Sequence, residues 1–182
     1  MALKDDGYDL FFCDAGENFH IKVNSKKGEA LVKNLPISKF IPLPIKTDKK
    51  LSTTDVKKFY DNSIWEKEAD KCLSCGACTS LCPTCMCFDI SDNPNLDVTS
   101  GKRTAEWDSC QYKDFTKVAG GHVFREKRLS RVKHRIYHKL QYFKEKFGEN
   151  MCTGCGRCIE GCPTKIDFVE TINNLNAVNG KD

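Results

Sequence analysis

The clearest pattern along the chain is an apolar stripe in its second half. The stripe recurs every three or four residues, at Leu129, Val132, Ile136, Leu140, Phe143 and Phe147. This spacing places the apolar side chains on one face of a helix. Gly148 follows directly, and glycine often occupies the position just after a helix end. The pattern predicts a long helix with one packed face that ends at Gly148.

Shorter patterns predict a small β unit near the start. Residues 8–13 form an apolar and aromatic run, and residues 19–23 alternate between apolar and polar side chains. The residues between them are turn formers. Residues 7–35 are therefore predicted to form a small β unit, in which Cys13 is a small buried apolar side chain.

The remaining segments indicate a linker and short helices. Prolines and lysines make residues 36–50 an extended linker. Residues 52–55 offer helix N-caps ahead of an apolar run that starts at Val56, and a further helical turn is expected through Trp65. Residues 166–175 predict a terminal helix, and the polar residues after it are expected to fray.

Twelve cysteines add chemistry to this pattern. Eight of them fall into two copies of one spacing, C-x2-C-x2-C-x3-C-P, and the copies end at Pro83 and Pro163. This is the spacing that holds [4Fe–4S] clusters in bacterial two-cluster ferredoxins. Structural zinc sites instead use two cysteine pairs separated by a longer loop. The sequence therefore predicts two [4Fe–4S] clusters rather than zinc.

The ligands can be divided between the two clusters. In two-cluster proteins the fourth cysteine of each run ligates the other cluster. The predicted ligands are Cys72, Cys75, Cys78 and Cys162 for one cluster, and Cys152, Cys155, Cys158 and Cys82 for the other. Glycine and alanine between the cysteines let the backbone approach the cluster. Each fourth cysteine is expected where a helix begins, and Trp65 and Leu73 are expected to shield the first cluster from water.

Three further cysteines lie outside the runs, at Cys85, Cys87 and Cys110. A free cysteine is usually a buried and inert side chain, so a structural role is favoured for all three. The alternative is an enzyme component in which they form a redox-active dithiol or an extra metal site. That alternative stays open because Cys85 and Cys87 are close to Cys82 in sequence.

These observations define the expected fold class, which is α+β and mainly α. Residues 1–50 are predicted to hold the small β unit and the linker. Residues 51–182 are predicted to form a ferredoxin-like domain with two clusters and a long helical insert at residues 83–151.

The charge distribution singles out the predicted long helix. The formal net charge is +4, but two oxidised clusters with their thiolates would add about −4. Residues 125–146 hold nine Lys or Arg against two Glu. Such a helix could contact nucleic-acid phosphates, but its apolar stripe favours a packed face and a docking surface for an acidic partner. The candidates for its outer face, or for contacts near the clusters, are Arg128, Arg131, Arg135 and Lys139.

Other function classes have no support in the sequence. No stretch approaches the roughly 18 apolar residues of a membrane span, and the first residues lack the apolar core of a signal peptide. Thiolate-bound clusters also need a reducing environment, so a cytoplasmic protein is expected. The chain shows no nucleophile–base pair, phosphate loop or dinucleotide fingerprint, so it is not expected to be an enzyme by itself.

Several segments outside the cysteine runs carry a resemblance to a known family. They are residues 82–89 (CPTCMCFD), 107–110 (WDSC), 119–121 (AGG) with Arg125 and Arg131, and 147–158 with the second run. Together they resemble the iron–sulfur β subunit of cytoplasmic sulfhydrogenase (sulfur reductase) and the corresponding iron–sulfur subunit of anaerobic sulfite reductase. The resemblance covers roughly residues 7–175. Members of this family usually carry a further domain before the β unit, whereas this sequence starts just before Tyr8.

The resemblance implies a fold and a role. The family resembles the α-helical ferredoxin fold, in which helices carry the two cluster loops. Its members pass electrons between a partner that binds flavin (FAD) and NAD(P)H and a catalytic reductase or hydrogenase partner. The chain is therefore expected to be an electron-transfer subunit of an oxidoreductase complex. The sequence leaves the terminal acceptor open among sulfite, polysulfide, protons and a heterodisulfide.

Overall fold

The computed structural model describes residues 7–39, 49–52 and 55–178. The chain divides into two compact units, residues 1–49 and residues 50–182, which we call the N-terminal unit and the cluster unit. Within the described residues the chain combines short helices with two small antiparallel sheets of two strands each. The mixed α and β composition that the sequence predicts is therefore present.

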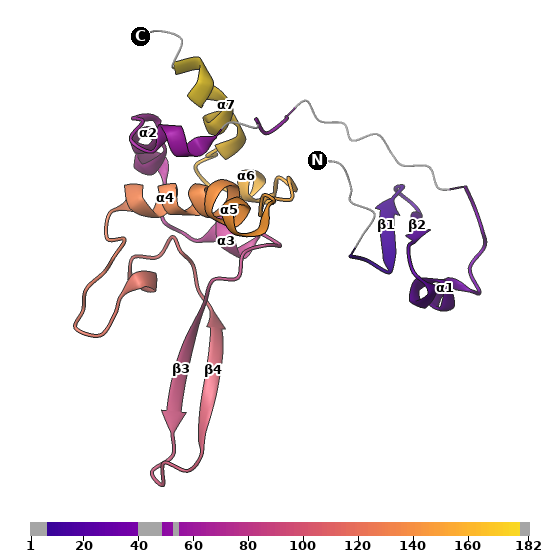
Figure 1. The fold of residues 1–182 in the computed structure, drawn as a ribbon, viewed down its shortest axis with the longest axis horizontal. Coiled ribbons are helices and arrows are strands. Elements are labelled where there is room, and N and C mark those ends of the chain that lie inside the picture. The colour runs from indigo at the N-terminus through magenta and orange to yellow at the C-terminus, as the bar shows by residue number, and fades with distance from the viewer. Residues whose placement is uncertain (1–6, 40–48, 53–54, 179–182) are drawn as a thin grey trace. The chain divides into compact units, whose positions relative to one another are not determined.

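The N-terminal unit is a β-hairpin followed by one helix (Figure 1). β1 (Leu10–Asp14) pairs antiparallel with β2 (Phe19–Val23), which confirms the predicted β unit. α1 (Lys26–Val32) follows, and the sequence analysis did not predict it. The Ser25 hydroxyl caps this helix by accepting a hydrogen bond from the N–H of Gly28.

The predicted linker is described only at its ends. Residues 36–39 and 49–50 have no regular secondary structure. Residues 40–48, the central part of the predicted linker, lie outside the described residues.

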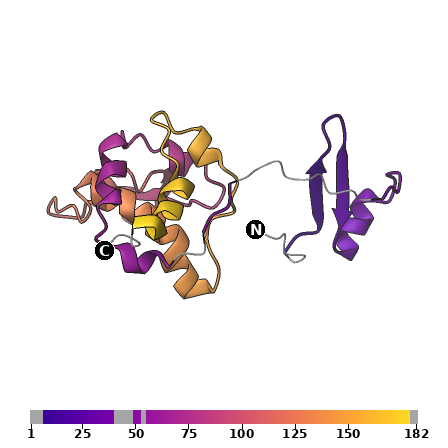
Figure 2. The ribbon, with the colours of Figure 1, turned by 90° about the horizontal axis from the view of Figure 1, so that it is seen from above.

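The cluster unit contains most of the helices, which gather into one group in the two views of Figures 1 and 2. In chain order its helical elements are η1 (Val56–Phe59), α2 (Ile64–Lys71), α3 (Ala77–Ser80), η2 (Asp114–Thr116), α4 (Arg128–Tyr137), η3 (His138–Tyr142), α5 (Phe143–Phe147), α6 (Arg157–Glu160) and α7 (Phe168–Val178). The predicted helices at Val56, Trp65 and residues 166–175 are confirmed, with shifted ends. Residues 179–182 of the expected frayed end lie outside the described residues.

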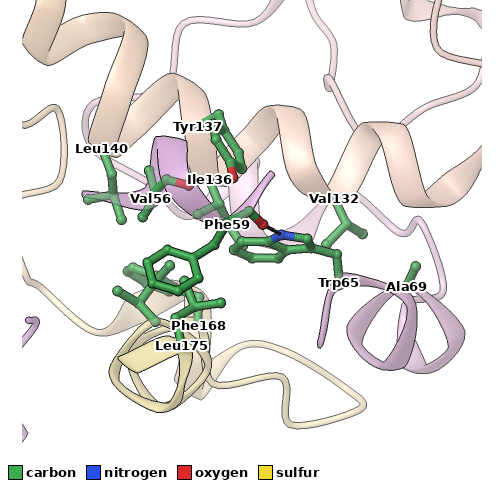
Figure 3. Close-up of a cluster of buried hydrophobic side chains, with 11 residues drawn as sticks. Val56, Phe59, Trp65, Ala69, Val132, Ile136, Tyr137, Leu140, Phe168 and Leu175 are labelled. Carbon is green, nitrogen blue, oxygen red and sulfur yellow. Dashed lines mark hydrogen bonds between the residues drawn. The ribbon is translucent and has the colours of Figure 1, made fainter. Parts of the chain in front are cut away.

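The core of the cluster unit lies between η1, α2, α4, η3 and α7 (Figure 3). Trp65 is fully buried, and its Nε1–H donates a hydrogen bond of 2.7 Å to the carbonyl of Phe59. The Tyr137 hydroxyl donates one of 2.6 Å to the carbonyl of Val56. Both polar atoms are thus satisfied inside an apolar cluster, where an unpaired one would be costly. The core joins the two ends of the cluster unit, because η1 and α7 both pack on it.

The predicted long helix is built from α4, η3 and α5, which follow one another without a break. The middle turn is a π turn, and Gly148 ends the helix at φ 78°. Val132, Ile136 and Leu140 of the stripe are buried, whereas Phe147 is 56% exposed. A π turn holds more residues than an α turn, so residues after it rotate away from the stripe. The predicted packed face is therefore wrong at its C-terminal end.

The insert at residues 83–151 is helical only in its second part. It opens with β3 (Phe88–Pro94) and β4 (Gly101–Trp107), which form an antiparallel hairpin with Phe88 opposite Trp107. This hairpin extends away from the helices in Figure 1. Nearly all of its residues are exposed, and Arg103 pairs with Asp92 across it.

Candidate iron–sulfur site

Two loops of matching backbone carry the cysteine runs. Ser74 and Gly154 occupy equivalent positions at φ 54° and 73°, and Gly76 and Gly156 follow at 76° and 73°. These left-handed angles favour glycine. At Gly76 a Cβ would also lie 2.7 Å from the Tyr112 hydroxyl. Each loop then enters a one-turn helix, α3 or α6, which holds the third cysteine of its run.

The fourth cysteine of each run follows this short helix. Cys82 comes after α3 and Cys162 after α6, so the expectation that a helix begins at the fourth cysteine is wrong. The next residue but one is a threonine in both copies. The Oγ1 atom of Thr84 lies 3.4 Å from Sγ of Cys82, and that of Thr164 lies 3.5 Å from Sγ of Cys162. The sequence analysis missed these threonines, although the repeated Cys-Pro-Thr was a visible signal.

The two cysteine runs come together in space. α3 packs against α6. A Cβ on Gly161 would clash with the side chain of Leu81, so glycine permits this close approach. The fourth cysteine of each run follows directly after these two residues.

One cavity collects cysteines from both runs. Its lining includes Cys72, Cys75 and Cys78 of the first run together with Cys158 and Cys162 of the second. Leu73 also lines it and is otherwise exposed. Trp65 is not part of the lining and lies in the apolar core, so the expected shielding role fits Leu73 alone.

The second run is tied to the loop that follows Cys82. The Thr84 hydroxyl donates a hydrogen bond of 2.7 Å to the carbonyl of Met151, directly before Cys152. Burial raises the pKa of Cys152. Burial also opposes ionisation of Cys82, but hydrogen bonds from Thr84 and Lys139 outweigh it and lower the pKa of Cys82 to about 7.

Three cations of the long helix point inward beside these cysteines. Arg131, Arg135 and Lys139 are only 6%, 8% and 3% exposed, while Arg128 is exposed. They recur every fourth residue and so lie on one helix face. Of the two placements left open by the sequence, these three residues take the one near the cysteines. They are also withdrawn from the outer face that a phosphate backbone would touch.

Each inward cation contacts a different part of the cysteine loops. Arg131 donates to the Ser74 hydroxyl at 3.3 Å. Arg135 donates to the carbonyl of Cys78 at 3.0 Å. Lys139 donates to the Thr84 hydroxyl at 3.0 Å.

The spare cysteines lie beside a separate cavity. Cys82, Cys85 and Cys87 line a cavity of about 240 Å³ together with Asp108. A hydrogen bond from the Cys110 thiol lowers the pKa of Cys87 to about 6, although burial opposes this. Cys110 is buried, as expected of a structural thiol, whereas Cys85 and Cys87 are half-buried.

The donor set fits iron–sulfur clusters. Every described cysteine is a free thiol, so all eight cysteines of the runs are available as ligands. Within the described residues, no three His, Cys, Asp or Glu side chains are arranged to hold a single metal ion. Cationic groups are buried beside the cysteines, where thiolates and a cluster would bring negative charge. The arrangement therefore suits multi-iron centres, whose ligands surround several metal atoms.

Comparison with known proteins identifies the class. A family model, the 4Fe–4S dicluster domain, matches residues 71–166. The chain belongs to this family and binds two [4Fe–4S] clusters. Its particular similarity is to Sulfhydrogenase 2 subunit beta from Pyrococcus furiosus, which is 34% identical over 188 residues.

The extent of this similarity is uneven. It covers 93% of the present chain and 55% of the relative, so the chain spans about half the length of the curated relative it matches. No solved structure matches the chain. In the part of the chain that the structure describes, no helix has the length and apolarity needed to cross a membrane.

Proposed function

We propose that this chain is an electron-transfer subunit that relays electrons through its two [4Fe–4S] clusters. The observation that carries the proposal is the convergence of two complete cysteine runs, within the dicluster domain, around buried cations. A [4Fe–4S] cluster with four cysteine ligands exchanges single electrons and offers no open iron for a substrate. The chain is therefore proposed to act as a relay and not as an enzyme by itself.

We propose that the fourth cysteines are exchanged between the clusters. Cys162 lines one cavity with Cys72, Cys75 and Cys78, which supports its assignment to the first run. Cys82 is assigned to the cluster of Cys152, Cys155 and Cys158. This assignment is supported by the Thr84–Met151 hydrogen bond, which ties the residues after Cys82 to the second run.

The residues around the cysteines supply fixed positive partial charge. The N–H of Ser74 donates to Sγ of Cys72 at 3.4 Å, and the N–H of Ile166 donates to Sγ of Cys162 at 3.3 Å. Hydrogen bonds to the ligand sulfurs raise the reduction potential of a cluster. Cys75 and Cys155 are exposed, so each run also reaches the surface, where a partner could exchange electrons.

The proposed partners are two other subunits. The similar protein from Pyrococcus furiosus is named as a beta subunit, so it works within an assembly. By the resemblance to this family, one partner would be a flavoprotein that uses NAD(P)H and FAD, and the other a catalytic reductase or hydrogenase subunit. A cytoplasmic location belongs to the same proposal.

Anaerobic co-purification tests the proposed function. The tagged chain is isolated from its own cells without oxygen, and the attached proteins are identified. We expect a flavoprotein, and we expect its pyridine nucleotide to reduce the clusters of this chain within the complex, followed by EPR. A chain that carries its clusters but gains no electrons from any co-purified protein would contradict the relay.

A second candidate role concerns the spare thiols. The cavity lined by Cys82, Cys85 and Cys87, with Cys110 hydrogen-bonded to Cys87, favours a redox-active thiol pair over inert packing for the cysteines that line it. Thiol counting on the reduced and oxidised holoprotein distinguishes the two, because an active pair loses two titratable thiols on oxidation.

A further inference from the structure

Arg135 stands out among the buried groups of the cluster unit. Its side chain is 8% exposed and comes from the middle of α4. One amino group donates to the carbonyl of Cys78, and the side chain also hydrogen-bonds the side chain of Cys158. Cys78 and Cys158 are the third cysteines of the two different runs. A single guanidinium therefore lies against both cluster loops.

A second observation concerns the Nε atom of this guanidinium. Nε of Arg135 is buried and has no hydrogen-bond partner among the described residues. A buried donor without an acceptor costs about 1–3 kcal/mol, and more when it is charged. Arg135 also lines the cavity that the cysteines share. The sulfur atoms of a bound cluster, which accept hydrogen bonds, would satisfy this donor.

The other inward cations are placed differently. Arg131 is held by the backbone carbonyls of Gln111, Arg125 and Glu126, so most of its donors already have partners. Lys139 reaches Thr84, beside Cys82. Arg135 alone, among the described basic residues of this helix, hydrogen-bonds cysteines of both runs.

We propose that Arg135 is a charge-compensating residue shared by both clusters, and that its positive charge sets both of their reduction potentials. Reduction adds one negative charge to a cluster. A fixed cation a few ångströms away in a poorly solvated site stabilises the reduced form. Because one guanidinium serves both loops, its removal acts on two redox centres at once. The inference rests on the two clusters alone and stands independently of the proposed partners.

The test is a potentiometric titration of the anaerobic holoprotein followed by EPR. Arg135→Gln keeps a polar side chain but removes the charge. We expect both midpoint potentials to become more negative, with each reduction equilibrium weakened about tenfold, which is about 59 mV for a one-electron couple. Arg128→Gln is the matched control, because it removes the same charge from an exposed position on the same helix. A shift of only one potential, or shifts no larger than those of Arg128→Gln, would overturn the proposal.

A second variant covers the case in which Arg135→Gln fails to retain its iron. Arg135→Lys keeps the charge but loses the branched guanidinium. We expect this variant to retain both clusters at potentials close to those of the natural chain. If Arg135→Lys also loses both clusters, the shape of the guanidinium is what matters, and charge compensation is wrong.

Discussion

At the scale of single residues, each run ends in a cysteine that belongs to its loop by sequence and approaches the other run in space. Cys162 shares a cavity with the first three cysteines of the first run. The side chain of Thr164 contacts its sulfur. Burial opposes ionisation of Cys162, but the hydrogen bonds prevail and lower its pKa. The sulfur is thus prepared as a thiolate, the form that binds iron.

The exchange of fourth cysteines leads to a mutational prediction. Cys82→Ala should damage the cluster held by Cys152, Cys155 and Cys158, and Cys162→Ala should damage the cluster held by Cys72, Cys75 and Cys78. The reason is that each substitution removes a ligand contributed from the other run. EPR and Mössbauer spectra of each variant identify which cluster remains. Loss of the sequence-local cluster in both variants would show that each run keeps its own fourth cysteine.

The spare thiols give a second prediction at this scale. Cys110→Ala should cost about 1 kcal/mol of stability but leave the iron of both clusters in place. The substitution also removes the hydrogen bond that lowers the pKa of Cys87. The pKa of Cys87 should therefore rise, and its alkylation by iodoacetamide should slow between about pH 6 and the ordinary thiol pKa of about 8.5.

Iron analysis and the pH profile of alkylation check this prediction, with Cys13→Ala as the control in the N-terminal unit. Loss of about four irons per chain from Cys110→Ala would instead place the spare thiols in a metal site. An alkylation profile identical to that of the natural chain would contradict the Cys110–Cys87 hydrogen bond.

The sequence predicts the ligands of the site better than their surroundings. Cysteine spacing is specific because a cluster loop is local, so the runs and their cofactor follow from a few residues. Arg135 could be placed only among several basic residues of the helix, since periodicity shows which residues share a face but not what that face packs against. Thr84 escaped notice because its role depends on Met151, which is 67 residues away.

At the scale of elements, the long helix combines two functions on neighbouring faces. Its apolar stripe packs on η1, α2 and α7, and its inward cations lie beside the cysteines. The spacing of the stripe predicts this helix well, but its π turn has no signal in the apolar pattern. The β3–β4 hairpin was missed for a different reason. Both of its faces are largely polar and exposed, so its alternation lacks the contrast that marks a half-buried strand.

The packing of these elements predicts a large effect at Trp65. Trp65→Ala should lower the free energy of unfolding by about 3–5 kcal/mol, because it empties a fully buried site at the junction of η1, α2 and α4. Anaerobic urea unfolding followed by far-UV circular dichroism measures the change. Trp107→Ala on the hairpin is the matched control, since Trp107 is 81% exposed, and it should cost less than about 0.5 kcal/mol. Equal costs at the two tryptophans would refute this assignment of the core.

At the scale of the whole molecule, the two units differ in what holds them together. The N-terminal unit has one hairpin and one short helix, and an isolated two-stranded hairpin is only marginally stable in water. The cluster unit contains every member of the buried apolar core. It also contains both cysteine runs and the inward cations. The features that hold the clusters are thus confined to residues 50–182.

This division predicts that residues 50–182 are sufficient to hold both clusters. The start of this piece is fixed within its own unit, because Asn173 accepts a hydrogen bond from the N–H of Ser52 and donates one to the carbonyl of Lys50. We expect the piece, produced anaerobically, to match the full chain in iron per chain and in both reduction potentials. A shorter piece that starts at residue 61 is the control. It lacks Val56 and Phe59 of the core, and with them the carbonyl acceptors of Tyr137 and Trp65. It should therefore lose its clusters or unfold at much lower urea. If the longer piece fails in the same way as the shorter one, the N-terminal unit is itself required for the cluster fold, and the division into independent units is wrong.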